Sequence, residues 1–339
     1  MTKTKTVKKY SLQDCPFYKA RSLTRIAECL TIRPRNINHP RYKRPQFNKL
    51  LHLTKDTLEE FTNDKCYKIH EITDKKGKKR KTEVPIPELK LLQRRMVDLF
   101  KRIDPPPYLY SATKKRSYVD NGKQHANGER LFKIDIKQFF PNTLYGYVYN
   151  FYRNILLCEK HVATVLAKLC TYDGHLPTGS PLSPILSFYA HKPMFDKIYQ
   201  LALDNGCIMT LYIDDIHISG ERATDGLLWE VQKIIHQHKM GYHKVQLYKK
   251  HATKTVTGTI IVGEEVRLRN RSHRAIHDGI IDINNLATPK EKLKFMTTLM
   301  GKANEAKQID PAYTGKVEYL RNQKKHLMRE LKKIIVAST

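Results

Sequence analysis

The sequence of 339 residues lacks a long apolar run and has few cysteines. No stretch approaches the roughly 18 apolar residues that span a bilayer, and the N-terminal segment MTKTKTVKKY has no apolar core of a secretion signal. We therefore expect a cytoplasmic protein with no membrane partner. The 6 cysteines form no C-x-x-C pair and no cluster with histidines at zinc spacing, which argues against a disulfide framework or a structural zinc site.

Glycine and proline are also scarce. Only 15 glycines and 16 prolines are present while 40% of the residues are apolar, which excludes a fibrous or disordered protein. The length predicts two or three domains or subdomains around a sizeable core.

Acidic residues are greatly outnumbered. The 33 Asp and Glu residues stand against 62 Lys and Arg residues, which gives a formal net charge of +29. Such an excess of positive charge indicates a polyanionic partner, because each phosphate neutralised by Lys or Arg releases counterions and adds affinity. Nucleic acid is the leading class of partner. Composition alone does not distinguish an enzyme from a binding protein.

Residue spacing predicts helices that alternate with short strands. Apolar residues recur at helical spacing from Leu23 to Leu30, and further helical patterns cover 46–62, 88–103, 142–170, 183–204, 223–239, 289–306 and 312–335. Residues 66–87 are typical of a hairpin with a lysine-rich tip. Strand-like runs follow at LFKIDIKQFF, MTLYIDDIHIS, KTVTGTIIV and EEVRLR. This alternation favours a sheet with helices packed on one face.

Two of the strand-like runs carry aspartates. In LYIDDIHIS, Asp214 and Asp215 are expected in the tight turn of a hairpin, although aspartate is also an ordinary turn residue. In LFKIDIKQFF, Asp135 lies among apolar side chains. A half-buried carboxylate needs a cation beside it, either a lysine such as Lys133 or Lys137 or a metal ion.

If the two runs are neighbouring strands, their three carboxylates meet. One or two carboxylates, completed by water and substrate phosphates, are the ligands that Mg²⁺ prefers. Two such ions, about 3.5–4 Å apart, would activate a 3′-hydroxyl and stabilise the leaving pyrophosphate.

Several segments in succession resemble a reverse transcriptase of the retron type. FKIDIKQFF is similar to the first palm motif of that family, LPTGSPLSPILS (176–187) to the second, and YIDD (212–215) to the polymerase Y-x-D-D box. NGKQH (121–125) is similar to the N-A-x-x-H signature of retron enzymes, and VTG (256–258) matches their V-T-G signature. PIPELKLLQ (85–93) resembles a helix that follows the basic hairpin in the family. The resemblance covers roughly residues 20–335.

The resemblance implies an α+β fold shaped as a right hand, with fingers, a palm made of an antiparallel sheet with helices on one face, and a helical thumb. It places an N-terminal helical extension and the start of the fingers at 1–64, the fingers at 65–124, the palm at 125–268 with interleaved helices at 142–182, and a basic helical thumb at 269–339.

The resemblance also implies the residues of the active site. Asp135, Asp214 and Asp215 would be catalytic and would hold two Mg²⁺ ions, for which Mn²⁺ can substitute, with the carbonyl of Ile136 as a further ligand. Phe140 would stack under the incoming sugar and exclude a 2′-hydroxyl, although plain core packing explains Phe139 and Phe140 equally well.

Other residues are expected to contact the nucleotide. Arg116 would bind the triphosphate, and Thr178 and Gly179 would approach the incoming base pair, unless LPTGSPLSP only caps a helix. Thr178 stands where the family often has Gln. Lys249 or Lys250 would protonate pyrophosphate, and the spacing does not choose between them.

Further positions are expected to bind RNA, although a charged run is often only a solvated face. Turn chemistry is an alternative for NGKQH, and a strand that ends at glycine is an alternative for VTG. The predicted RNA-binding residues are Lys78, Arg80, Asn121, His125, Lys290, Lys294, Arg321 and Lys325.

The function that follows is an RNA-directed DNA polymerase of a retron. It would use deoxynucleoside triphosphates and a cognate structured noncoding RNA, both as template and as the source of a priming 2′-hydroxyl, and would make branched multicopy single-stranded DNA. A separate effector protein in antiphage defence and a host RNase H are the implied partners. The alternatives are a defence-associated or group II intron-like reverse transcriptase with another template, and a non-catalytic RNA-binding protein on a polymerase scaffold.

Overall fold

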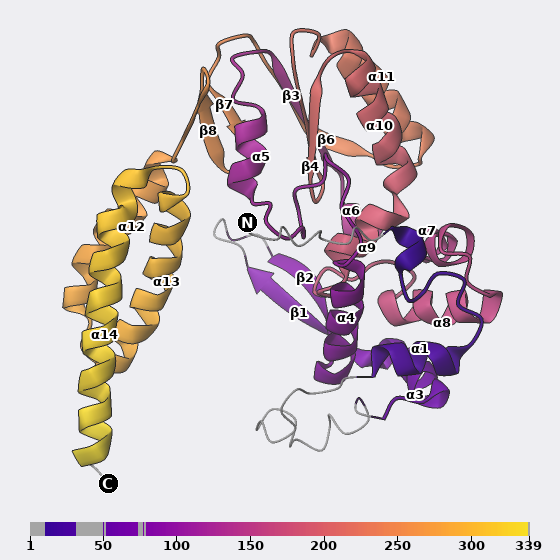
Figure 1. Cartoon of the computed structure of the whole chain (residues 1–339), viewed down its shortest axis with the longest axis horizontal. Helices are drawn as coiled ribbons and strands as arrows, with labels where there is room; N and C mark the ends of the chain where they lie inside the picture. Colours follow the sequence, from indigo (N-terminus) through magenta and orange to yellow (C-terminus); the bar gives the residue numbers. More distant parts are fainter. Residues whose placement is uncertain (1–10, 32–49, 51, 74–76, 78, 338–339) are drawn as a thin grey trace, which may run out of the picture.

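The computed structural model of the chain describes residues 11–31, 50, 52–73, 77 and 79–337 (Figure 1). Helices are combined with short antiparallel sheets, so the predicted α+β class is confirmed. None of the helices in this described part has both the length and the apolar character needed to cross a membrane.

A four-stranded antiparallel sheet, here called the central sheet, lies in the middle of the chain. Its strands run in the order β4-β5-β3-β6. Their bounds are β3 Leu131–Ile136, β4 Ile208–Tyr212, β5 Asp215–Ser219 and β6 Tyr242–Tyr248. In β3, Phe132, Ile134 and Ile136 are fully buried on one face, whereas Lys133 and Asp135 are half-buried on the other. This alternation is what a sheet with one face on the core requires.

Helices cover the apolar face of the central sheet, as predicted. Helices α10 (Lys192–Asp204) and α11 (Asp225–Gln237) pack on each other and contact β4 and β6 respectively, and Figure 1 shows them side by side next to the sheet. Helix α9 (Ser183–Ala190) precedes α10, and the predicted helical stretch 142–170 is divided into α7 (Tyr145–Asn150), a π-helical turn (Phe151–Ile155) and α8 (Lys160–Cys170).

The N-terminal part contains the predicted hairpin. Strands β1 (Tyr67–Thr73) and β2 (Lys79–Pro85) pair antiparallel, while Lys75, Lys76 and Lys78 of its tip lie outside the described residues. The helices around it are α1 (Leu23–Leu30), α3 (Lys55–Glu60) and α4 (Pro87–Phe100). Short 3-10 turns lie at Leu12–Asp14 and Asp64–Cys66. The prediction of a helix at 46–62 holds for α3, and its first residues fall largely outside the described part.

Two predicted strand boundaries were wrong. The run LFKIDIKQFF does not continue as a strand, because Gln138 has φ +48° and turns the chain into the short helix α6 (Phe139–Asn142). KTVTGTIIV is a hairpin rather than one strand. Its strands β7 (Lys254–Val256) and β8 (Thr259–Val262) are joined by Thr257 and Gly258, both with positive φ, and β9 (Glu265–Arg267) completes a small three-stranded sheet.

The C-terminal helices form a bundle with a core of their own. Helices α12 (Asn270–Asn285), α13 (Pro289–Lys307) and α14 (Thr314–Ala337) pack around Ile276, Met296, Leu299, Val317 and Leu320, with a 3-10 turn at Pro311–Tyr313 before α14. In Figure 1 this bundle, orange to yellow, stands beside the rest of the chain. It follows directly after β9 in the chain. Sequence spacing predicted α13 and α14 but not α12.

Buried histidines, of which His125 and His191 are two, predict a loss of stability in acid. Burial lowers the pKa of His125 to about 3, with Lys254 adding to the effect, and lowers that of His191 to about 4, with His238 adding to it. Below the ordinary histidine pKa of 6.5, each of these histidines becomes protonated in the unfolded chain but stays neutral in the folded chain. The free energy of unfolding therefore falls as pH drops from 6.5 towards 4. We expect each histidine to cost about 1.4 kcal/mol per pH unit in this window.

Urea unfolding at pH 7.5, 6.5 and 5.5 measures this slope. The variant His191→Gln, which can keep the hydrogen bond to Thr143, should have a shallower dependence on pH than the natural protein. An identical slope in the variant would show that His191 is not one of the titrating groups.

Candidate active site

The hairpin β4–β5 carries two of the predicted catalytic aspartates. Asp215 is the first residue of β5 and pairs with Tyr212 across the turn, while Ile213, with φ +60°, and Asp214 make the turn itself. The backbone N–H of Ile213 donates to Oγ of Ser111 at 2.9 Å, which holds the turn in place. The prediction of a tight hairpin that bears both carboxylates is confirmed.

The third aspartate lies on the adjacent strand. Asp135 of β3 is directly opposite Asp215 of β5, and the N–H of Ile136 donates to the carbonyl of Asp214 at 2.9 Å. Segments almost 80 positions apart in the sequence therefore bring three aspartates to one edge of the central sheet. The expectation that the two runs are neighbouring strands is confirmed.

These carboxylates repel one another. Burial, then the charges of Asp214 and Asp135, raise the pKa of Asp215 to about 6. Burial and the charge of Asp135 also raise the pKa of Asp214. The folded chain thus concentrates negative charge in a partly desolvated place where a cation would relieve the repulsion.

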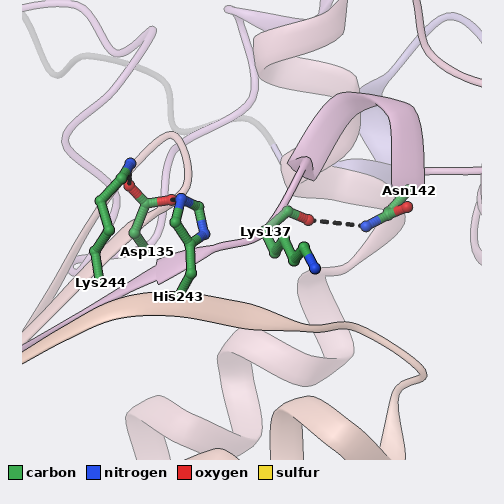
Figure 2. A network of polar contacts seen from close by, with 5 residues as sticks. All are labelled: Asp135, Lys137, Asn142, His243 and Lys244. Atoms are coloured by element: carbon green, nitrogen blue, oxygen red, sulfur yellow. Dashed lines mark hydrogen bonds and ion pairs between the residues drawn. The ribbon is translucent and has the colours of Figure 1, made fainter.

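The protein cations nearest to Asp135 come from β6 and were not predicted. Nζ of Lys244 lies 2.8 Å from one carboxylate oxygen, and Nε2 of His243 lies 3.4 Å from the other. Figure 2 shows both side chains against Asp135, whereas the side chain of Lys137 points away and its carbonyl accepts a hydrogen bond from Asn142. The expectation that a lysine lies beside Asp135 is therefore met by Lys244, and not by Lys133 or Lys137, which were named as examples.

The donor set fits a magnesium ion that is completed by substrate. Within the residues that the structure describes, no three His, Cys, Asp or Glu side chains form a ready metal-binding group. Mg²⁺ is usually held by one or two carboxylates together with water and substrate phosphates, so Asp135 and Asp214, the predicted main ligands, would suffice, with Asp215 opposite Asp135 as the weaker third carboxylate. The ion would supply charge neutralisation and Lewis acidity there.

Lys244 lies where it would compete with such an ion for Asp135. Its side chain is 67% exposed, so its pairing with Asp135 is screened by solvent. We expect Lys244→Met to tighten the binding of Mn²⁺ to the protein roughly two- to fivefold, because a competing positive charge is removed. Electron paramagnetic resonance of free Mn²⁺, without nucleic acid, measures this, and Lys197→Met, an exposed lysine on α10, is the control. Weaker binding in Lys244→Met would contradict the expectation.

Phe139 and Phe140 differ in burial. Both lie in helix α6 rather than in the predicted strand. Phe139 is 3% exposed and packs against Phe195 and His191, whereas Phe140 is only half-buried. Core packing therefore accounts for Phe139, and Phe140 remains the predicted contact for the nucleotide sugar.

The loop Thr178–Gly179–Ser180 packs against the hairpin β1–β2. The backbone N–H and the hydroxyl of Thr178 donate to Glu83 at 2.9 and 2.8 Å, and the N–H of Gly179 donates to the carbonyl of Glu83. A Cβ atom at Gly179 would lie 2.6 Å from that carbonyl oxygen, so only glycine permits this approach. The close approach predicted for Gly179 is thus made to β2, and its approach to a base pair remains a prediction.

Part of the Arg116 guanidinium is already used in hydrogen bonds within the chain. Its Nη1 donates to the carbonyls of Pro106, Pro107 and Leu109 at 2.6–3.2 Å, and its guanidinium lies over the ring of Tyr110. Arg116 therefore fixes the segment 106–110. Only its remaining N–H groups are left for the predicted contact with triphosphate.

The two lysines predicted as proton donors lie at the end of the central sheet that is far from the aspartates. Lys249 and Lys250 follow Tyr248, which is opposite Leu131, four residues and roughly 13 Å along β3 from Asp135. Lys250 instead pairs with Glu129 at 2.9 Å. We correct the prediction accordingly. Lys244, by contrast, pairs with Asp135.

The NGKQH and VTG segments pack on each other. NGKQ belongs to helix α5 (Tyr118–Gln124), not to a turn, and Nδ2 of Asn121 donates to Oγ1 of Thr257 at 3.1 Å. Gly122 is required because a Cβ there would lie 2.3 Å from Oγ1 of Thr259.

Asn121 and His125 are both fully buried. His125 bonds Ser219 and Thr210, each at 2.7 Å, and so ties α5 to the central sheet. Direct contact of these two side chains with RNA is therefore corrected to a structural role.

The other predicted RNA-binding residues lie on the surface. Arg80 is exposed on β2, and Lys78 lies outside the described residues. The remaining four are exposed on α13 and α14, namely Lys290, Lys294, Arg321 and Lys325.

An antiparallel sheet whose adjacent strands carry aspartates at one edge, with a basic hairpin before it and a basic helical bundle after it, is the arrangement of a template-directed nucleic acid polymerase. Residues 72–296, more than half of the chain, match the family model described as "Reverse transcriptase (RNA-dependent DNA polymerase)". The chain belongs to this family, and the predicted activity of an RNA-directed DNA polymerase is confirmed at that level.

Curated relatives are retron enzymes, which confirms the predicted resemblance. The chain is 26% identical over 231 residues to the Retron Ec86 reverse transcriptase of Escherichia coli, covering 65% of this chain and 71% of that protein. It is 24% identical over 276 residues to the Retron Ec73 reverse transcriptase of Escherichia coli, covering 77% and 84%.

Two solved structures are also similar. A foamy viral protease-reverse transcriptase in complex with double-stranded DNA has a TM-score of 0.42 and 17% identity, over 76% of this chain and 38% of that chain. Telomerase from Candida albicans has a TM-score of 0.47 and 12% identity, over 74% of this chain and 55% of that chain.

Proposed function

We propose that the chain is the polymerase of a retron. It copies a cognate structured noncoding RNA into DNA from deoxynucleoside triphosphates, starts from a 2′-hydroxyl of that RNA, and yields branched multicopy single-stranded DNA. The observation that carries the polymerase chemistry is the pairing of Asp135 with Asp215 on adjacent strands, next to Asp214 in the turn. The curated relatives support the retron assignment.

In this proposal the chain's own residues perform three tasks. Asp135, Asp214 and Asp215, with the carbonyl of Ile136, would hold the two Mg²⁺ ions, which would supply Lewis acidity and charge neutralisation. Phe140 limits the sugar that can enter. The exposed cations of α13 and α14, with Arg80, follow the phosphates of the RNA and of the RNA–DNA hybrid, because such contacts give affinity without sequence specificity.

The helical boundaries support the predicted division into fingers, palm and thumb. The palm would hold the central sheet, and the thumb would be the bundle α12–α14, which has its own core. The cytoplasmic location, the separate effector protein, the antiphage role and the host RNase H belong to the proposal through the family resemblance.

The proposal is tested by expressing the chain together with its neighbouring genomic locus, purifying the protein and sequencing the nucleic acid that copurifies with it. A DNA strand joined covalently to an internal 2′-hydroxyl of RNA is the expected result. Linear DNA products, or extension of any template equally well without the neighbouring RNA, would instead favour a group II intron-like or other defence-associated enzyme. RNA bound without any DNA synthesis would indicate a non-catalytic binding protein.

A further inference from the structure

The C-terminal bundle α12–α14 meets the rest of the chain at a junction that is not fully packed. Its core is separate from the core around the central sheet, and the link from β9 to α12 consists of Leu268 and Arg269. A cavity of about 800 Å³ lies beside this link, between Lys123 of α5, Val266 of β9 and His273 of α12. Because side chains do not fill this space, the bundle has room to pivot about the link.

One side-chain hydrogen bond crosses the junction. The hydroxyl of Tyr118, the first residue of α5, donates to Oε1 of Glu305 on α13 at 2.5 Å. This distance is typical of a hydroxyl that donates to an ionised carboxylate, and such a bond is stronger than one between neutral groups. Burial and then Glu305 raise the pKa of Tyr118, so the phenol keeps the proton that it donates.

Tyr118 has a fixed place relative to the central sheet. Oγ1 of Thr257 donates to the carbonyl of Tyr118 at 3.1 Å, and a Cβ atom at Gly258 would lie 3.8 Å from the Tyr118 ring. The turn between β7 and β8 therefore contacts both the backbone and the ring of Tyr118. At the other end of α5, His125 bonds to Ser219 of β5. Helix α5 thus connects the central sheet to the residue that bonds the bundle.

Glu305 is an acidic residue on a helix rich in exposed lysines, among them Lys294, Lys302 and Lys307. A negative charge among cations that would bind phosphates weakens that binding, so its presence needs another reason. The other acidic residue of α13, Glu291, caps the start of the helix. The hydrogen bond to Tyr118 is the corresponding structural role for Glu305.

We propose that the Tyr118–Glu305 hydrogen bond is a latch that fixes the bundle relative to the central sheet and so sets how long the enzyme holds its RNA–DNA hybrid. The aspartates and the cations of the bundle lie on opposite sides of the junction, and one duplex must contact both. Without the latch the bundle pivots and the hybrid dissociates faster, while the chemistry at the aspartates is unchanged. Tyr118 and Glu305 are then positioning residues. The inference rests on that part of the proposed function in which the bundle binds nucleic acid.

The pivoting is measured on the free, full-length protein. Exposed Gln200 of α10 and Asn322 of α14 are each replaced by azidophenylalanine, a nitroxide is coupled to both, and pulsed electron paramagnetic resonance gives the distribution of the distance between them. Tyr118→Phe, which deletes only the hydroxyl, should broaden this distribution. Tyr319→Phe, a half-exposed tyrosine on α14, is the matched control and should leave the width unchanged. Equal widths in the two variants would overturn the inference.

The hold on nucleic acid is measured as the dissociation rate of a DNA primer annealed to an RNA template. Tyr118→Phe should raise this rate roughly three- to tenfold, the effect of one hydrogen bond at a solvent-exposed place. The single-turnover rate of nucleotide addition to prebound duplex should stay the same. A change in that rate with no change in dissociation would contradict the proposed role.

A double-mutant cycle separates the latch from a general effect of charge or stability. In a Glu305→Ala background, Tyr118→Phe should have no further effect on dissociation, because the bond is already absent. In a Glu318→Ala background, which removes an exposed acid of α14, Tyr118→Phe should keep its full effect. The same effect in both backgrounds would overturn the inference. Because the duplex is synthetic, that result would leave the retron assignment intact, whereas a failure to find branched DNA would overturn the retron assignment and leave the latch intact.

Discussion

Asp214→Asn is expected to abolish DNA synthesis while the protein stays folded and binds RNA. The substitution removes one of the three carboxylates at the edge of the central sheet without changing its size. Metal ions at such a site supply several kcal/mol of transition-state stabilisation, so we expect a loss of roughly a thousandfold or more in the rate of nucleotide addition. Primer extension on an RNA template, with product resolved to single nucleotides, measures this.

Unfolding is not an alternative explanation for this loss. Burial and the charge of Asp135 raise the pKa of Asp214, which means that the folded chain disfavours its ionised form. A neutral amide at this position therefore leaves the free energy of unfolding unchanged or increased at pH 7. RNA affinity should also persist, because the exposed cations that would track phosphates lie on α13 and α14.

The matched control for this prediction is Asp282→Asn, which neutralises an exposed aspartate on α12. It should retain the natural rate of synthesis. Thermal melting and anisotropy with the same RNA complete the comparison. If Asp214→Asn extended primers at the natural rate, the catalytic assignment of the aspartates would be wrong, and the chain would bind RNA through a polymerase scaffold with another active centre or none.

The sequence was most informative where a pattern was both local and strong. The aspartates of β4–β5 interrupt two apolar runs and Asp135 interrupts a third, so the alternation predicted strands that carry carboxylates, whereas the adjacency of these strands was only a hypothesis until the structure confirmed it. The hairpin β1–β2 and the helices with clear apolar periodicity were predicted for the same reason. In each case the residues that set the structure lie within a few positions of one another.

Prediction from the sequence failed where tertiary contacts decide the structure. Strand β6 is half-buried to exposed along its length, so it lacks the alternation that marks a strand, yet it supplies Lys244 and His243 to Asp135. Helix α5 contains Asn-Gly, which is typical of a turn, but Gly122 serves the close approach to Thr259.

Phe140→Val is expected to relax the choice of nucleotide sugar. Phe140 is half-buried in the first turn of helix α6, five residues after Asp135. A shorter side chain leaves room for a 2′-hydroxyl that the aromatic ring would exclude. Steric discrimination of this size in a pocket is worth roughly ten- to hundredfold, so the preference for deoxynucleotides over ribonucleotides should fall by that factor. Competition between dGTP and GTP on one template measures the ratio of kcat/KM.

The neighbouring ring gives the control for this prediction. Phe139 is 3% exposed and packs on Phe195 and His191, so Phe139→Val should create a cavity and lower the free energy of unfolding by roughly 1–3 kcal/mol, with the sugar preference unchanged. The two substitutions delete the same atoms from adjacent positions and should have opposite consequences. A loss of stability without a change of preference in Phe140→Val would mean that both rings belong to the core, and that another residue excludes ribonucleotides.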